Sequence, residues 1–135
     1  MNSIKQPELY HIGIKKFDDE HQQLVTMVND IHALTDDNQK NRNIQKQIIT
    51  SLVKLARAHF AGEEEHMRRQ KYPDLDKHHQ CHRIIYAQLL DLERRFASTS
   101  GPVHNHALQF LYNWLDEHIL TEDKQYADYS LKAYT

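Results

Sequence analysis

The segment LDKHHQCHRIIYAQLLDLERRF, residues 75–96, carries the clearest structural pattern in the chain. Apolar residues and histidines recur in it at alternating spacings of three and four residues, in the order Leu75, His78, His82, Ile85, Leu89, Leu92 and Phe96. This spacing is typical of a helix that presents one seam to the core of a helical bundle. We therefore expect a helix over residues 75–97, with imidazoles where a bundle normally has apolar side chains.

Helical spacing of apolar residues also appears on both sides of this segment. Asp18 and Asp19 are predicted to cap the first helix. Pro73 is predicted to end the second, because proline lacks an amide hydrogen and clashes with the preceding turn. The additional helices are expected over residues 18–35, 43–70 and 103–126.

Short connectors make successive helices antiparallel neighbours, so the predicted fold is all-α, an up-down-up-down antiparallel four-helix bundle. The 135 residues suit a single domain with one core, spanning residues 1–135. Residues 1–17 contain Pro7 and Gly13 and are predicted to form an irregular N-terminal arm.

Composition limits the classes of function. The formal net charge is −2, and basic residues are dispersed, so nothing indicates nucleic-acid binding. No apolar run approaches the ~18 residues of a membrane-spanning helix, and the first residues do not resemble a signal peptide. The single cysteine, Cys81, suits a reducing compartment. We expect a cytoplasmic monomer that is not attached to a membrane.

Eleven histidines in this chain are a clear excess. Several of them lie on the predicted apolar seams, together with acidic residues. In an up-down bundle, the start of the first helix is level with the end of the second, the start of the third and the end of the fourth. The polar residues that fall in this single layer are His21, His59, Glu63, His78, His82, His118 and Asp123.

Burying this layer without partners would be costly. A buried polar group that lacks a hydrogen bond costs roughly 1–3 kcal/mol, and a whole domain is stable by only about 5–15 kcal/mol. Cations remove the cost, because imidazole nitrogens and carboxylate oxygens then become metal ligands. Seven ligands suit two metal ions, with one or both carboxylates bridging them. Iron, manganese and zinc are all compatible with these ligands, and iron is our choice.

The spacing of His118 and Asp123 does not fit a regular α-helix. Five residues advance about 500° around the axis, which leaves the two side chains about 140° apart. If Asp123 is to reach the same metal ions as His118, the fourth helix must bulge or loosen after His118. We therefore expect an irregular segment there.

Four motifs together resemble the hemerythrin family, most closely its single-domain bacterial members. They are DDEHQQLV (18–25), HFAGEEEHM (59–67), YPDLDKHHQCH (72–82) and WLDEHILTEDKQY (114–126). The resemblance implies a di-iron centre in which His78, His82 and His118 hold one iron. His21 and His59 would hold the other. Both irons would be bridged by Glu63, by Asp123 and by an oxo or hydroxo group.

The resemblance also implies a function, which is reversible binding of O2 at the iron with an open position. Leu24, Leu115 and Ile119 match the apolar O2 pocket of the family. The protein would be an O2 carrier, store or sensor with no catalytic residues, and would serve an O2-consuming enzyme or a signalling partner. The alternatives are a di-iron oxidase or peroxidase, and a regulatory module that responds to NO or iron.

Other polar residues receive ordinary interpretations. Glu64 and Glu65 are expected to be solvated, and Cys81 is expected to be a structural thiol. Surface or interface positions are expected for His11, His32, His66, His79, His104 and His106.

Overall fold

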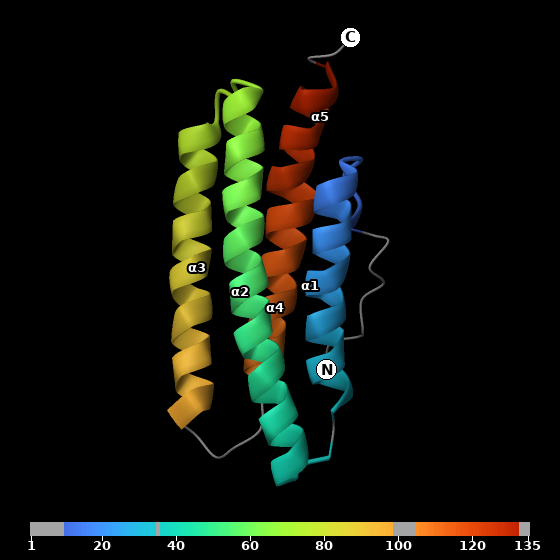
Figure 1. Cartoon of the computed structure of the whole chain (residues 1–135), viewed down its shortest axis with the longest axis vertical. Coiled ribbons are helices and arrows are strands. Elements are labelled where there is room, and N and C mark those ends of the chain that lie inside the picture. The colour runs from blue at the N-terminus through green and yellow to red at the C-terminus, as the bar shows by residue number, and fades with distance from the viewer. Residues whose placement is uncertain (1–9, 35, 99–104, 133–135) are drawn as a thin grey trace.

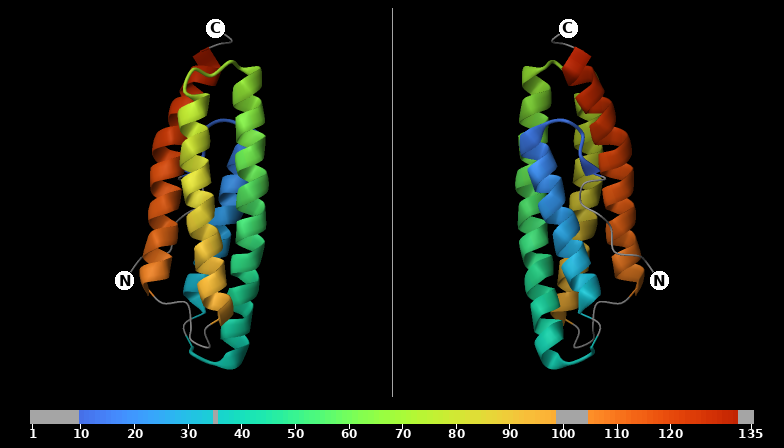
Figure 2. Two further views of the ribbon diagram at one scale, coloured as in Figure 1. Left: turned by 90° about the vertical axis from the view of Figure 1, so that its left-hand side faces the viewer. Right: turned by 90° about the vertical axis from the view of Figure 1, so that its right-hand side faces the viewer.

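The computed structural model describes residues 10–34, 36–98 and 105–132, and these form a bundle of helices that run alternately up and down (Figure 1). The elements, in order, are α1 (Lys15–Ala33), α2 (Gln39–Arg69), α3 (Leu75–Ser98), α4 (Asn105–Glu117), the π-helix η2 (His118–Asp123) and α5 (Lys124–Lys132). The segments α4, η2 and α5 continue one another as a single rod, as both views in Figure 2 show. The predicted antiparallel four-helix bundle is confirmed.

The start of α1 differs from the prediction. The helix begins at Lys15, and its N-cap is Ile14, which makes no side-chain capping bond. The carboxylate of Asp18 instead accepts hydrogen bonds from the backbone amides of Ile12, at 2.6 Å, and Gly13, at 3.2 Å. The predicted capping role of Asp18 and Asp19 was therefore wrong, because Asp18 reaches back and stabilises the turn that enters the helix.

The other helix ends are displaced by a few residues. Helix α2 begins at Gln39 because Asn38 is its N-cap, and the Asn38 side chain accepts a hydrogen bond from the amide of Asn41 at 2.9 Å. Pro73 lies in the turn between α2 and α3, as expected. The last rod continues to Lys132, beyond the predicted end at residue 126. Of the predicted arm, residues 1–9 lie outside the described residues.

The core lies between the rods and is continuous along the bundle. Each rod contributes a stripe of buried apolar side chains, including Leu24 and Val28 from α1, Leu52 from α2, Leu89 from α3 and Leu111 from α4. Burying each such side chain stabilises the fold by roughly 1.5–3 kcal/mol. Within the described residues, no helix is long and apolar enough to cross a membrane.

The topology brings four helix ends to one level. In Figure 1 the start of α1, the end of α2, the start of α3 and the segment around η2 all lie in the upper half of the bundle. This is the layer in which the sequence predicts the polar residues.

Candidate metal centre

The seven predicted site residues are all buried, with exposed fractions between 0% and 5%, and the structure brings all seven together. Their possible ligand atoms form two clusters, and within each cluster these atoms lie within 4.8 Å of one another. We call the first the three-histidine group, which consists of Glu63, His78, His82, His118 and Asp123. We call the second the two-histidine group, which consists of His21, His59, Glu63 and Asp123.

The segment from His118 to Asp123 is a π-helix, so the expected irregularity is present. A π-helix has backbone hydrogen bonds from residue i to residue i+5, and its wider turn brings residues five apart onto one face. The His118 Nε2 atom lies 3.2 Å from Asp123 Oδ1. The wide turn thus solves the geometric problem posed by the spacing, and places imidazole and carboxylate side by side.

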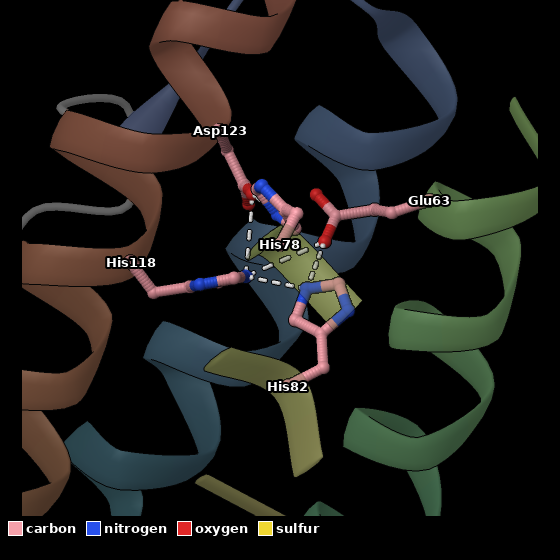
Figure 3. Close-up of side chains that lie close together, drawn as sticks. All are labelled: Glu63, His78, His82, His118 and Asp123. Atoms are coloured by element: carbon pink, nitrogen blue, oxygen red, sulfur yellow. Dashed lines mark hydrogen bonds and ion pairs between the residues drawn. The ribbon is translucent and has the colours of Figure 1, made fainter. Parts of the chain in front are cut away.

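In the three-histidine group, side chains from α2, α3 and η2 point toward a common centre (Figure 3). The Nε2 atoms of His82 and His118 are 3.0 Å apart. Glu63 Oε1 lies 3.2 Å from His82 Nε2 and 3.4 Å from His118 Nε2. Asp123 Oδ1 lies 3.0 Å from His78 Nε2. Three imidazoles thus converge on one oxygen atom from each carboxylate.

The two-histidine group uses the remaining oxygen atoms of the same carboxylates. The Nε2 atoms of His21 and His59 are 3.1 Å apart. Asp123 Oδ2 lies 3.1 Å from His21 Nε2, and Glu63 Oε2 lies 3.4 Å from His59 Nε2. Each carboxylate therefore directs one oxygen to each group, which is the arrangement of a bridging ligand between two cations.

Outer partners determine which nitrogen of these imidazoles faces the centre. Carboxylate and carbonyl oxygens only accept hydrogen bonds, so an Nδ1 atom bonded to one carries the hydrogen and its Nε2 atom keeps a free lone pair. The Nδ1 hydrogen bonds are those of His21 with the Tyr10 carbonyl at 3.2 Å, His59 with Glu20 at 2.7 Å and His82 with Glu64 at 2.9 Å. His118 Nδ1 lies 3.3 Å from Glu122 Oε2, within ion-pair distance.

When these imidazoles are neutral in this tautomer, the inner layer presents lone pairs and carboxylate oxygens, with no hydrogen between them. In that state the facing Nε2 lone pairs of His21 and His59, 3.1 Å apart, would repel one another. Glu63 Oε2 is buried and has no hydrogen-bond partner among the described residues. A cation placed in each group would turn these repulsions into ligand bonds. The residues present thus fit a pair of metal ions.

The pKa values of the buried groups also indicate that this layer favours bound positive charge. Burial alone would lower the pKa of His59, but the carboxylates of Glu63 and Glu20 outweigh burial and raise this pKa to about 10. Burial favours the neutral form of Glu63, yet His59 and His118 hold the Glu63 pKa well below its usual value. Without a metal ion, protons are the cations that this layer attracts.

Aliphatic side chains adjoin the two groups along the helices. Leu24 follows His21 by one turn, Leu115 precedes His118 by one turn, and Ile119 follows His118 directly. All three are buried, and Phe60 stacks on His82 with 4.2 Å between the ring centroids. The assignment of Leu24, Leu115 and Ile119 to an O2 pocket stays a prediction.

The sequence interpretation missed the acidic residues that hold the histidines from outside. Glu64, expected to be solvated, accepts hydrogen bonds from His82 and from the surface residue His79. Of these, Glu122 could have been found from the sequence, because it follows His118 by one turn. Glu20 and Glu64 contact histidines of other helices, which residue spacing does not indicate.

The remaining histidines are exposed or partly exposed wherever the structure describes them, as expected. His66 bonds to the buried Tyr126, and His32 bonds to Tyr112. His104 lies outside the described residues. Cys81 is a partly buried free thiol.

Comparison with known proteins agrees with this geometry. Residues 12–129 match the sequence profile of the hemerythrin HHE cation binding domain. The chain belongs to the hemerythrin family. Because the match spans most of the chain, it includes all seven residues of the two groups.

Curated hemerythrins resemble the chain over most of its length. The bacteriohemerythrin of Stenotrophomonas maltophilia (strain R551-3) is 29% identical over 118 residues, which cover 87% of this chain and 75% of that protein. The myohemerythrin of Theromyzon tessulatum is 29% identical over 119 residues, which cover 88% of this chain and 87% of that protein.

A crystal structure of wild-type hemerythrin superposes with a TM-score of 0.80 at 24% identity, covering 95% of this chain and 97% of that one. At this identity the superposition supports the fold of the bundle.

Proposed function

We propose that this protein binds O2 reversibly at a non-haem di-iron centre. The observation that carries the proposal is the division of Glu63 and Asp123 between two buried groups, with one oxygen of each carboxylate directed to each group. Membership of the hemerythrin family supports iron as the metal. The names of its relatives, bacteriohemerythrin and myohemerythrin, support O2 as the ligand.

Each group would hold one iron. His78, His82 and His118 would bind the first, His21 and His59 would bind the second, and Glu63 and Asp123 would bridge the two together with an oxo or hydroxo group. The two-histidine group supplies one nitrogen fewer than the other. Its metal would therefore keep a free position, and that is where we place O2. When bound, the iron pair supplies the electrons exchanged with O2.

The ligand types favour reversible binding over oxidation of a substrate. Ferritin-like di-iron proteins use four carboxylates for two metals, whereas this centre offers two carboxylates and five imidazoles. Neutral imidazoles donate less negative charge than carboxylates, and so stabilise highly oxidised iron less. The buried side chains of Leu24, Leu115 and Ile119 would keep water and protons from the ligand. We therefore propose a non-enzymatic O2 carrier, store or sensor.

Repeated oxygenation tests this function. The iron-loaded protein is reduced without air, exposed to O2, and then returned to argon while its visible absorption is recorded. We expect an absorption band that appears with O2 and disappears on deoxygenation over several cycles. Zinc-loaded protein is the matched control, and its spectrum should not change. Permanent oxidation of the iron within one cycle would instead indicate an oxidase and would refute the proposal.

The cellular location is proposed from a single residue. The free thiol of Cys81 supports a reducing compartment, so we propose the cytoplasm. A monomer that supplies an O2-consuming enzyme or a signalling partner stays a prediction from the sequence.

A further inference from the structure

The two groups draw on different parts of the chain. The three-histidine group takes its residues from α2, α3 and η2, and none from α1. The two-histidine group needs α1, because His21 lies on that helix. A metal ion can therefore meet five ligand residues in the first group before α1 contributes anything. In the second group it meets four, and one of these is His21.

The outer contacts repeat this division. His82 donates to Glu64, which lies on α2, and His118 lies beside Glu122 in its own rod. The two-histidine group is held from α1 and from the residues before it. His59 donates to Glu20 of α1 at 2.7 Å, and His21 donates to the backbone carbonyl of Tyr10 at 3.2 Å.

Glu20 is the side chain that links α1 to the histidine of α2 in this group. Its side chain is only 18% exposed, so water competes weakly for the hydrogen bond with His59. The bond fixes the ring of His59 with Nε2 toward the centre, 3.1 Å from the Nε2 atom of His21. It also makes the imidazole a stronger donor to a metal. Asp19, one residue earlier, is exposed and pairs only with Lys15 among the contacts described.

We propose that the centre fills in order, with the three-histidine group first and the two-histidine group second, and that Glu20 is the positioning residue that enables the second group to retain its metal. The inference rests on the two-metal centre of the proposed function, but it does not depend on O2.

The order follows from ligand number and from the shared carboxylates. The first ion takes the richer set of ligands, and its charge offsets part of the negative charge of Glu63 and Asp123. The second ion then meets carboxylates that are already partly neutralised. It therefore depends more on His21 and His59, and on the contacts that orient these rings. Loss of an outer hydrogen-bond partner typically lowers metal affinity by about 10–100-fold.

Titration of the metal-depleted full chain with Zn2+ tests the order. Calorimetry counts the binding steps, and NMR of the imidazole nitrogens identifies the histidines that respond in each step. We expect the first equivalent to shift the signals of His78, His82 and His118. The second equivalent should shift those of His21 and His59. Simultaneous change of all five histidines, or the reverse order, would overturn the proposal.

Variants test the role of Glu20. In Glu20→Ala, the affinity of the second step should fall by about 10–100-fold, whereas that of the first should change by less than about threefold. Glu20→Gln keeps an acceptor oxygen and should restore part of the lost affinity. Asp19→Asn is the matched control and should leave both steps unchanged. Glu64→Ala should weaken the first step instead.

Circular dichroism of each variant shows whether the helices are retained, and Glu20→Gln provides the test if Glu20→Ala loses helicity. Unchanged second-step affinity in a folded Glu20 variant, or equal loss in both steps, would contradict the assignment. If the Zn2+ steps appear as expected but iron-loaded protein fails to bind O2, the proposed function fails while the loading order holds.

Discussion

Replacement of Glu63 by Gln tests whether one buried carboxylate serves both metals. The side chain is fully buried, and its two oxygens lie 3.2–3.4 Å from the Nε2 atoms of His59, His82 and His118. Glutamine keeps the shape but removes the charge and one acceptor oxygen. Both groups should therefore lose affinity at once, which no residue confined to one group would cause.

The magnitude follows from linkage between metal binding and folding. With free metal at 100 times the dissociation constant, each site stabilises the native state by about 2.7 kcal/mol, so two sites give about 5 kcal/mol. For a chain of 135 residues, this raises the melting temperature by about 15–20 °C. After a 100-fold loss of affinity, metal binding stabilises the native state by only about 0.4 kcal/mol per site. The two sites together then raise the melting temperature by less than about 3 °C.

The assay compares melting temperatures with and without metal for each protein, so that effects of the substitution on the metal-free fold cancel. Metal content per chain is measured in parallel. Glu65→Gln is the matched control, because Glu65 lies two residues away and pairs with Arg68 and Arg69 at the surface. In this control, metal should raise the melting temperature as much as it does in the unaltered protein. A Glu63→Gln variant that retains two metals and the full gain would refute the bridging role.

Three further predictions concern pH and the scaffold. Burial lowers the pKa of His59, but the carboxylates outweigh burial and raise it to about 10, so the contribution of His59 to the stability of metal-free protein is complete below about pH 6.5 and is lost as pH rises toward 10. The melting temperature of metal-free protein should therefore fall between about pH 6.5 and about pH 10, and an increase over that range would contradict this. Gln45→Ala, which removes bonds to the carbonyls of Ile31 and Leu34, should cost about 1–3 kcal/mol in urea unfolding without lowering metal content. Gly13→Ala should cost about 1–2 kcal/mol in the same assay, since Gly13 has a φ of 95°; an unchanged midpoint would argue against strain there.

Periodicity allowed much of the fold to be predicted from the sequence. Apolar spacing identified the rods, and antiparallel order brought His21, His59, His78 and His118 to one level. The wide turn before Asp123 could also be anticipated, because a regular α-helix cannot place His118 and Asp123 on one face. These features depend on the geometry of single helices and on the order in which they follow one another.

Contacts between rods could not be predicted in the same way. Glu64 lies in a run of three glutamates and looks solvated in the sequence, until the neighbouring rod brings His82 against it. Glu20 likewise depends on how α1 is rotated toward α2. Asp18 had the composition of a cap, yet it bonds to the amides before the helix because the chain turns back at Gly13. Packing between the helices determines how each rod is rotated and which path each turn takes. The spacing of residues along one helix does not indicate either of these.

Anomalous X-ray diffraction at the iron absorption edge, from crystals of the iron-loaded protein, tests the central claim most directly. The account predicts two iron peaks per chain. One should lie among His78, His82 and His118, the other beside His21 and His59, with Glu63 and Asp123 contacting both. A single peak, or iron bound away from these side chains, would contradict it.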